Sequence, residues 1–154
     1  MEIYKAKVMG FCYGVRRAMN IAEKAAETHD NAVTFGPLIH NPQVVSRLEA
    51  RGVPVVNDLN KLNNETVIIR SHGVGPSCYN TLKCKHLGLV DATCPFVRRN
   101  QEITKKLVAD GKQVVLIGEK KHPEMKSVSE WAVGKSFIVE TMEDVDKLPH
   151  FEEA

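Results

Sequence analysis

Hydrophobic residues recur along this chain with two alternating periods. Short apolar runs at 32–35, 66–70 and 113–117 predict β-strands. Between such runs, apolar residues recur every three to four positions, as they do from Val15 to about Thr28, and this spacing predicts amphipathic helices. Strands that alternate with helices are typical of a parallel sheet. We therefore expect an α/β fold with helices on both faces of the sheet.

The first and last segments of the chain carry further local signals. Tyr4, Ala6 and Val8 alternate with lysines, which predicts a strand at residues 2–8. We expect further strands at 53–56, 89–90 and 136–139. We expect helices that begin at Pro42, Pro76 and Pro95 and end by Gly52, Gly88 and Gly111, respectively. The remaining elements are a helical turn near 58–62, a helix through 125–131, and a last helix capped by Thr141 and Asp144.

The βα units form two successive groups. One group runs to about Ala92, and a second starts at Thr93, which we expect to cap the helix that follows. We therefore expect a first α/β unit at 1–92 and a second at 93–154.

Composition narrows the class of protein. With 43% hydrophobic and 26% charged residues among 154, the chain suits a globular domain, and its net charge of +2 does not favour nucleic acid or a membrane surface as a partner. No apolar run approaches the ~20 residues of a membrane span. We expect a cytoplasmic protein whose four cysteines are reduced, and the lack of a C-x-x-C pair argues against a zinc ribbon.

Five reactive residues each follow an expected strand. Because the carboxyl ends of parallel strands meet at one edge of a sheet, their loops should gather there and form a ligand site. Taken singly, each residue has a plainer explanation as a core, cap or surface residue, and only their common position argues for a site. These residues are Cys12, His40, His72, Cys94 and His122.

The three histidines share a local context. Each stands beside a proline or glycine turn and before a helix N-terminus, whose free amides attract anions. This arrangement suits a phosphate or diphosphate, although a capping histidine or a zinc ligand remains open for each. Glu124 lies two residues beyond His122 and could carry a proton, or it could simply complement the helix dipole.

Two cysteines stand where a thiolate would be stabilised. Cys94 lies beside the expected start of a helix, and Gly10 and Gly14 bracket Cys12 in a tight loop. A thiolate can bind a metal, but a small buried thiol is the plainer alternative. Cys78 and Cys84 lie six apart in an expected helix, and we interpret both as structural thiols.

Five motifs together resemble one family, 4-hydroxy-3-methylbut-2-enyl diphosphate reductase, which catalyses the terminal step of the non-mevalonate isoprenoid pathway. Their order and spacing agree across nearly the whole chain. The motifs are Gly10–Ala18, Gly36–Val45, Arg70–Val74, Asp91–Val97 and His122–Glu124.

The resemblance implies a reductive loss of the substrate hydroxyl at a 4Fe–4S cluster, giving isopentenyl and dimethylallyl diphosphate. It implies Cys12 and Cys94 as cluster ligands and Glu124 as the proton donor to the leaving hydroxyl. Ferredoxin or flavodoxin would supply electrons. The residues implied to bind the substrate diphosphate are His40, His72 and His122.

The resemblance also implies a trefoil of three similar α/β units, of which this chain would hold the first and an incomplete second. The third unit, which carries the third cluster cysteine, is absent from the sequence. We therefore expect this chain to be a truncated part of the enzyme. The resemblance does not imply that this part is active by itself. Ser127 and Glu130 replace glycines that are usual in the family.

Three alternatives stay open at this point. A zinc-dependent hydrolase could use Cys12, Cys94 and the histidines, because zinc accepts nitrogen and sulfur ligands. A non-catalytic phosphate-binding α/β module would use only the histidine loops. A purely structural fragment would associate with a partner through an exposed apolar face.

Overall fold

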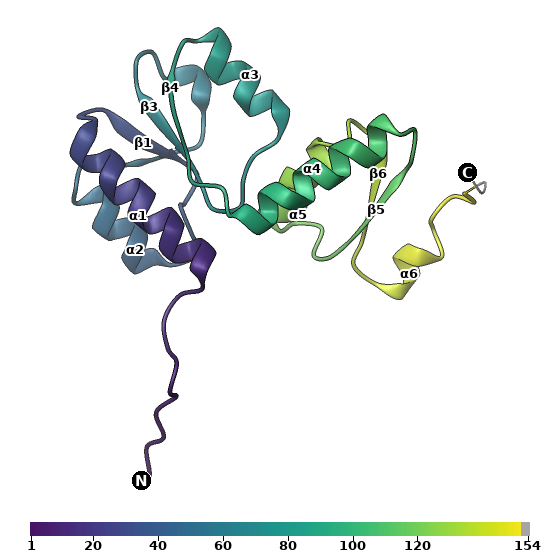
Figure 1. Cartoon of the computed structure of the whole chain (residues 1–154), viewed down its shortest axis with the longest axis horizontal. Helices are drawn as coiled ribbons and strands as arrows, with labels where there is room; N and C mark the ends of the chain where they lie inside the picture. The colour runs from purple at the N-terminus through teal and green to yellow at the C-terminus, as the bar shows by residue number, and fades with distance from the viewer. Residues whose placement is uncertain (152–154) are drawn as a thin grey trace.

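The computed structural model describes residues 1–151, which form two separate parallel sheets and their flanking helices (Figure 1). The first sheet has the strand order β2-β1-β3-β4, and the second pairs β5 with β6. The strands are β1 Ala32–Phe35, β2 Val55–Val56, β3 Thr66–Ile69, β4 Gly88–Asp91, β5 Val114–Ile117 and β6 Ser136–Val139. The helices are α1 Tyr13–Thr28, α2 Pro42–Glu49, the short 3₁₀ helix η1 Leu59–Lys61, α3 Pro76–Cys84, α4 Pro95–Ala109, α5 Pro123–Glu130 and α6 Met142–Val145.

The expected α/β class with parallel sheets is confirmed, and most element boundaries agree to within a few residues. Proline opens α2, α3, α4 and α5, because its fixed φ and missing N–H suit the first helical turn. The helix expected up to Gly88 ends earlier, at Cys84, since Gly88 is already the first residue of β4. Asp144 Oδ2 accepts the backbone N–H of Thr141 at 3.1 Å, which confirms the cap of α6.

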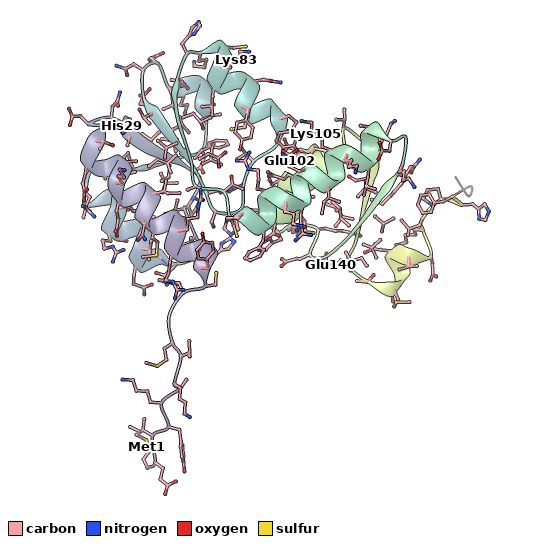
Figure 2. All side chains as sticks on the ribbon, in the orientation of Figure 1. Met1, His29, Lys83, Glu102, Lys105 and Glu140 are labelled. Atoms are coloured by element: carbon pink, nitrogen blue, oxygen red, sulfur yellow. The ribbon has the colours of Figure 1, made fainter. Side chains whose placement is uncertain are left out.

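The strand predicted at residues 2–8 is wrong. Residues 1–10 are exposed and contain no strand, and Figures 1 and 2 show them running away from the helices, with Met1 at the far tip. Alternation of apolar and polar residues indicates a strand only where a second strand pairs with its backbone groups. No strand among residues 1–151 lies beside this segment.

Strand β3 is the centre of the first sheet, and both of its faces are buried. Ile68 packs with α1 and α2 in one cluster that includes Ala18, Ala22 and Leu48. Its neighbours Val67 and Ile69 point the other way into a second cluster formed with α3 and η1. The helices thus cover both faces, as expected.

The second sheet is covered differently. Helices α4 and α5 pack on each other, and they contact β5 and β6 respectively. Two residues of β5 stay on the surface, where Ile117 is 84% exposed. No helix among residues 1–151 is both long and apolar enough to cross a membrane.

Candidate functional site

Three histidine rings converge at the carboxyl edge of the sheets. The ring centroids of His40 and His72 lie 4.4 Å apart, and each lies 5.6 Å from that of His122. One ring nitrogen from each residue falls within 4.8 Å of the others. The loops after β1, β3 and β5 thus bring together residues that are up to 82 positions apart in the sequence.

Backbone hydrogen bonds hold the loops of the first sheet in register. The N–H and the hydroxyl of Ser71 both donate to the carbonyl of Leu38, at 3.1 and 3.0 Å. The N–H of Cys94 in turn donates to the carbonyl of Ser71 at 2.9 Å. Ser71 is buried, so these bonds are sheltered from water and fix the loops that carry His40 and His72.

The protonation of His122 follows from its place at the start of α5. It is the N-cap residue, and its Nδ1 accepts the backbone N–H of Glu124 at 3.2 Å. A nitrogen that accepts a hydrogen bond carries no proton, so in the neutral ring the proton is on Nε2. His122 therefore offers an Nε2–H donor, which suits an anionic oxygen.

His72 is half-buried, and its Nδ1 has no hydrogen-bond partner among the described residues. Burial, followed by the charges of the neighbouring His40, Arg70 and His122, lowers its pKa to about 4. His72 is thus neutral near pH 7 in the free protein. A bound anion would oppose this effect, because a nearby negative charge favours the protonated ring.

The two candidate cluster cysteines lie at the starts of α1 and α4. Cys12 is the N-cap of α1 and Cys94 that of α4, and neither side chain caps its own helix. A Cβ placed on Gly14 would come within 2.5 Å of Cys94 Sγ, so the thiol of Cys94 lies directly over the first turn of α1. Thr93, expected as the cap, lies one residue before it.

With this geometry established, comparison with known proteins identifies the family. A sequence model of the family described as LytB protein matches residues 3–153. The chain belongs to the LytB family.

Two curated relatives of this LytB chain carry the same name. The chain is 47% identical over 150 residues to 4-hydroxy-3-methylbut-2-enyl diphosphate reductase of Geobacter sulfurreducens, covering 97% of this chain and 53% of that protein. The enzyme of that name from Caldanaerobacter subterraneus is 42% identical over 159 residues, with 100% and 55% covered. The chain thus spans about half the length of the curated relatives it matches.

Solved structures show the same likeness. The E-1-hydroxy-2-methyl-but-2-enyl-4-diphosphate reductase of Plasmodium falciparum superposes with a TM-score of 0.89 at 31% identity, covering 94% of this chain and 46% of that one. A structure of (E)-4-hydroxy-3-methyl-but-2-enyl diphosphate reductase, the terminal enzyme of the non-mevalonate pathway, gives 0.78 at 41% identity, with 90% and 50% covered.

A network around Asp91 supports the Cys94 loop of this LytB chain. The carboxylate accepts hydrogen bonds from the Thr93 N–H at 2.9 Å, from the Tyr79 hydroxyl at 2.8 Å and from the Arg98 guanidinium. Burial alone would raise the pKa of Asp91, but these hydrogen bonds outweigh burial and lower it. Arg17 Nη1 also reaches across from α1 to the Thr93 carbonyl, at 3.1 Å.

A second set of contacts joins the two sheets beside the histidines. Gly73 has φ +70°, and a Cβ there would meet Gln101 Nε2 at 2.5 Å. Gln101, itself buried, donates to Ser127 Oγ at 2.7 Å, and Trp131 Nε1 donates to the Val74 carbonyl at 3.0 Å. This packing sets where α5, and hence His122, lies relative to His72.

The structure does not bring every candidate into the close group. Neither the two cysteines nor Glu124 belongs to the group of ring nitrogens formed by the histidines. Cys78 is buried, which raises the pKa of its thiol to about 11, and Cys84 is an exposed thiol.

Sequence reasoning missed the residues that support the site. In the sequence, Ser127 stands out only as a departure from the family, and the spacing of Asp91 to Thr93 is a local turn signal. Arg17, Gln101 and Trp131 have hydrogen-bond partners that lie far away in the chain, so no local signal indicates them. Those missed were Arg17, Arg70, Asp91, Arg98, Gln101 and Trp131.

Proposed function

We propose that this chain forms part of an enzyme that reduces 4-hydroxy-3-methylbut-2-enyl diphosphate to isopentenyl and dimethylallyl diphosphate. Membership of the LytB family and the names of its relatives support the reaction. The observation that carries the proposal is the convergence of three imidazole rings at one sheet edge. Residues 1–92 and 93–154 would form the first α/β unit and part of the second of a three-unit trefoil.

The histidines would bind the diphosphate end of the substrate. His122 offers its Nε2–H to a phosphate oxygen, and His40 and His72 lie close enough to share the same anion. Fixing that end presents the hydroxyl end of the substrate in a constant position, which lowers the entropic part of the barrier.

Glu124 would supply the proton that turns the hydroxyl into a leaving water. It lies in the first turn of α5, half-buried, and its own N–H anchors His122. A substrate held by His122 would therefore lie near the backbone that carries Glu124. The carboxylic acid gives its proton to the hydroxyl oxygen as the C–O bond breaks and water leaves. Two electrons from a donor protein reduce the allylic group, and a second proton, from water, forms the new C–H bond of the product.

Cys12 and Cys94 fit an iron–sulfur cluster as two of its ligands. Both thiols are free, both begin helices, and the thiol of Cys94 lies against the turn that follows Cys12. Thiolates are the ligands that hold such clusters. When bound, a 4Fe–4S cluster would supply the electrons and an iron that accepts the leaving oxygen.

The remaining parts of the proposal concern partners and place. Ferredoxin or flavodoxin would be the electron donor. Free thiols suit a reducing compartment, and we place the enzyme in the cytoplasm.

Calorimetric titration of the chain with inorganic diphosphate tests the binding site. We expect His40→Ala, His72→Ala and His122→Ala each to weaken binding at least tenfold, because each removes a hydrogen bond to a charged group worth about 1.5–3 kcal/mol. His29→Ala is the matched control, since His29 is exposed and lies at the C-terminal end of α1, the end opposite to Cys12 (Figure 2). Equal affinity in all four variants would contradict the proposal.

Anaerobic reconstitution with iron and sulfide tests the cluster ligands separately. Cys12→Ser and Cys94→Ser should each lower the bound iron and labile sulfide per chain, while Cys84→Ser, which changes an exposed thiol, should not. Incorporation that is indifferent to Cys12 and Cys94 would overturn their assignment.

A zinc-dependent hydrolase is the second candidate, because three neighbouring histidines can hold zinc. Metal-bound histidines usually donate their other ring N–H to a carbonyl or carboxylate. His122 instead accepts at Nδ1, which leaves the proton on Nε2 and disfavours a metal there. One tightly bound zinc per chain, lost in His122→Ala, would favour the hydrolase.

A further inference from the structure

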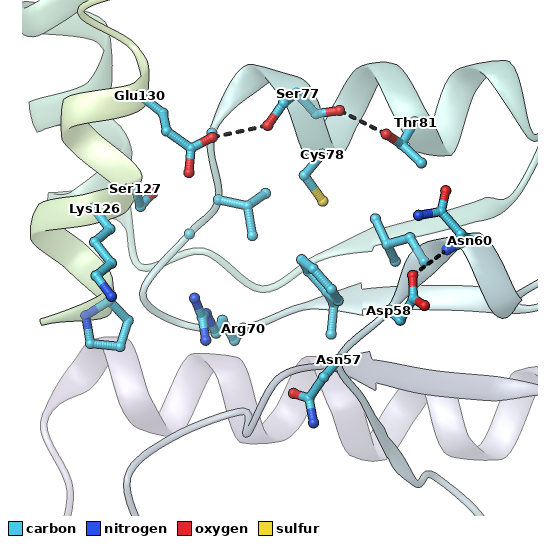
Figure 3. Close-up of a pocket in the computed structure, with 16 residues that line it drawn as sticks. Asn57, Asp58, Asn60, Arg70, Ser77, Cys78, Thr81, Lys126, Ser127 and Glu130 are labelled. Atoms are coloured by element: carbon cyan, nitrogen blue, oxygen red, sulfur yellow. Dashed lines mark hydrogen bonds between the residues drawn. The ribbon is translucent and has the colours of Figure 1, made fainter. Parts of the chain in front are cut away.

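A cleft separate from the group of ring nitrogens lies between the first sheet and α5 (Figure 3). It encloses about 440 Å³. One wall comes from the ends of β1 and β3 and from the start of α3, and the opposite wall comes from α5. The cleft therefore has one wall on each side of the junction between the two sheets.

Arg70 lies inside this cleft without a partner. Its Nε is buried and has no hydrogen-bond acceptor, and the guanidinium forms no ion pair with residues 1–151. Its guanidinium packs over Gly36, where a Cβ would come within 2.7 Å of Nη1 and where a φ of +70° favours glycine. Burial lowers the pKa of Arg70, but a guanidinium stays charged at neutral pH.

Two carboxylates also line the cleft and accept hydrogen bonds, and the charge of Glu130 acts on Arg70 by raising its pKa. Asp58 Oδ1 accepts the N–H of Asn60 at 2.9 Å, and Glu130 Oε2 accepts the hydroxyl of Ser77 at 3.0 Å. Lys126 of α5 faces the same cleft and has no ion-pair partner among the described residues. Figure 3 shows the head groups of Arg70 and Lys126 at the same end of the cleft, away from Asp58.

We propose that this cleft binds a small phosphomonoester, with its phosphate between Arg70 and Lys126. A half-buried cation that forms no ion pair is costly, and a bound anion lowers that cost. A phosphate group carries nearly two negative charges and three acceptor oxygens, which matches the fork of an arginine together with a lysine. The cleft is of the size usual for small-molecule sites, and Asn57 and Asn60 offer amides to hydroxyl groups of the ligand.

The ligand would act on the histidine site through its two walls. Arg70 precedes His72 by two residues, and Lys126 follows His122 by one helical turn, its N–H donating to the His122 carbonyl at 3.1 Å. A phosphate that bridges Arg70 and Lys126 would hold these two histidines at a fixed separation. This site does not depend on the proposed reductase activity.

Fluorescence of the single tryptophan gives a direct readout. Trp131 follows Glu130, which lines the cleft, and donates to the carbonyl of Val74, another lining residue. The 154-residue chain is titrated with inorganic phosphate and with glycerol 3-phosphate at constant ionic strength. We expect a saturable change in emission with both, and tighter binding of glycerol 3-phosphate.

The variants separate the cleft from the histidines. Arg70→Met should raise the apparent Kd at least tenfold and Lys126→Met about threefold, whereas Lys121→Met, which removes an exposed charge outside the cleft, should leave it unchanged. His40→Ala should also leave it unchanged. Because Lys126 is exposed, its variant keeps the test decisive even if Arg70→Met does not fold.

Two results would overturn the proposal. One is a fluorescence change that His40→Ala abolishes and Arg70→Met preserves, which would mean that phosphate binds only at the histidines. The other is the lack of any saturable change in the unmodified chain. Loss of diphosphate binding in the histidine variants, with phosphate binding in the cleft intact, would bear on the histidine site alone.

Discussion

Strands β3 and β5 have nearly the same composition but very different surroundings. Thr66–Ile69 is buried along its whole length, whereas β5 alternates between buried and exposed residues, with Val115 39% and Ile117 84% exposed. Both runs predict a strand equally well, because apolar β-branched residues favour extended backbone in either setting. Composition therefore indicates the element but not its burial.

The difference arises from the elements that cover each strand. β3 lies between β1 and β4 and has helices on both faces, so each of its side chains enters one of two core clusters. β5 pairs only with β6, and α4 and α5 pack on the second sheet. Stability should therefore depend far more on the first sheet than on the exposed residues of the second.

Truncation of one isoleucine in each strand gives the largest expected contrast. Ile68→Ala in β3 should lower the free energy of unfolding by about 3 kcal/mol, because it removes buried methyl groups and leaves a cavity. Ile117→Ala in β5, the matched control, should change it by no more than about 0.5 kcal/mol. Urea denaturation measures both, and equal losses would show that the second sheet is covered in solution.

The junction between the sheets provides the next contrast. Gly73→Ala should cost about 2–3 kcal/mol, because a Cβ at φ +70° is strained and would also meet Gln101, Ser127 and Thr93. Gly111 has a similar φ of +79° but open space around it, so Gly111→Ala should lower the free energy of unfolding by only about 1 kcal/mol. Thermal or urea unfolding of these two variants separates the effect of packing from that of backbone strain. An equal loss of stability in both variants would contradict close packing of Gly73 against Gln101.

The titration of His72 gives the smallest effect. Its pKa is lowered to about 4 in the folded chain, from an unfolded value of about 6.5, so the unfolded chain binds more protons between these values. The free energy of unfolding should then fall as pH drops from about 6.5 to 4. Above about pH 6.5 this ring should add nothing to the pH dependence of stability. For a half-buried ring, solvent screening limits the loss to about 1–2 kcal/mol.

Comparison with a variant isolates this histidine from the carboxylates that also titrate at low pH. His72→Gln should lose less stability than the unmodified chain between pH 7 and 4.5, whereas His29→Gln, which changes an exposed ring, should follow the unmodified chain. Identical pH dependence of His72→Gln and the unmodified chain would show that His72 titrates normally.

Local signals predicted the parts of the fold that local geometry controls. The prolines that open α2, α3 and α4 and the Thr141–Asp144 cap were predicted correctly, because each acts within one turn of helix. The strand at 2–8 was predicted by the same kind of signal and was wrong, because a strand also needs a neighbour. Cys12 consequently does not follow a strand, although it still begins a helix beside Cys94.

For the site, the sequence indicated which residues could act, and the fold placed some of them together. His40, His72 and His122 were singled out because each follows an expected strand, and their rings do converge. Their roles and those of the cysteines and Glu124 stay predictions. The proton position on His122 could not be read from the sequence, because it depends on a hydrogen bond with a specific backbone N–H.

The sequence by itself determined the order of helices and strands from α1 onward, the α/β class and the set of histidines, because successive residues carry the period of a helix or a strand. Only the tertiary structure decided which strand faces are covered, how far the histidine rings lie from one another, and that Arg70 lies without a partner in a cleft beside them. These features depend on contacts between residues far apart in the chain. Such contacts are fixed by packing and leave no local period in the sequence.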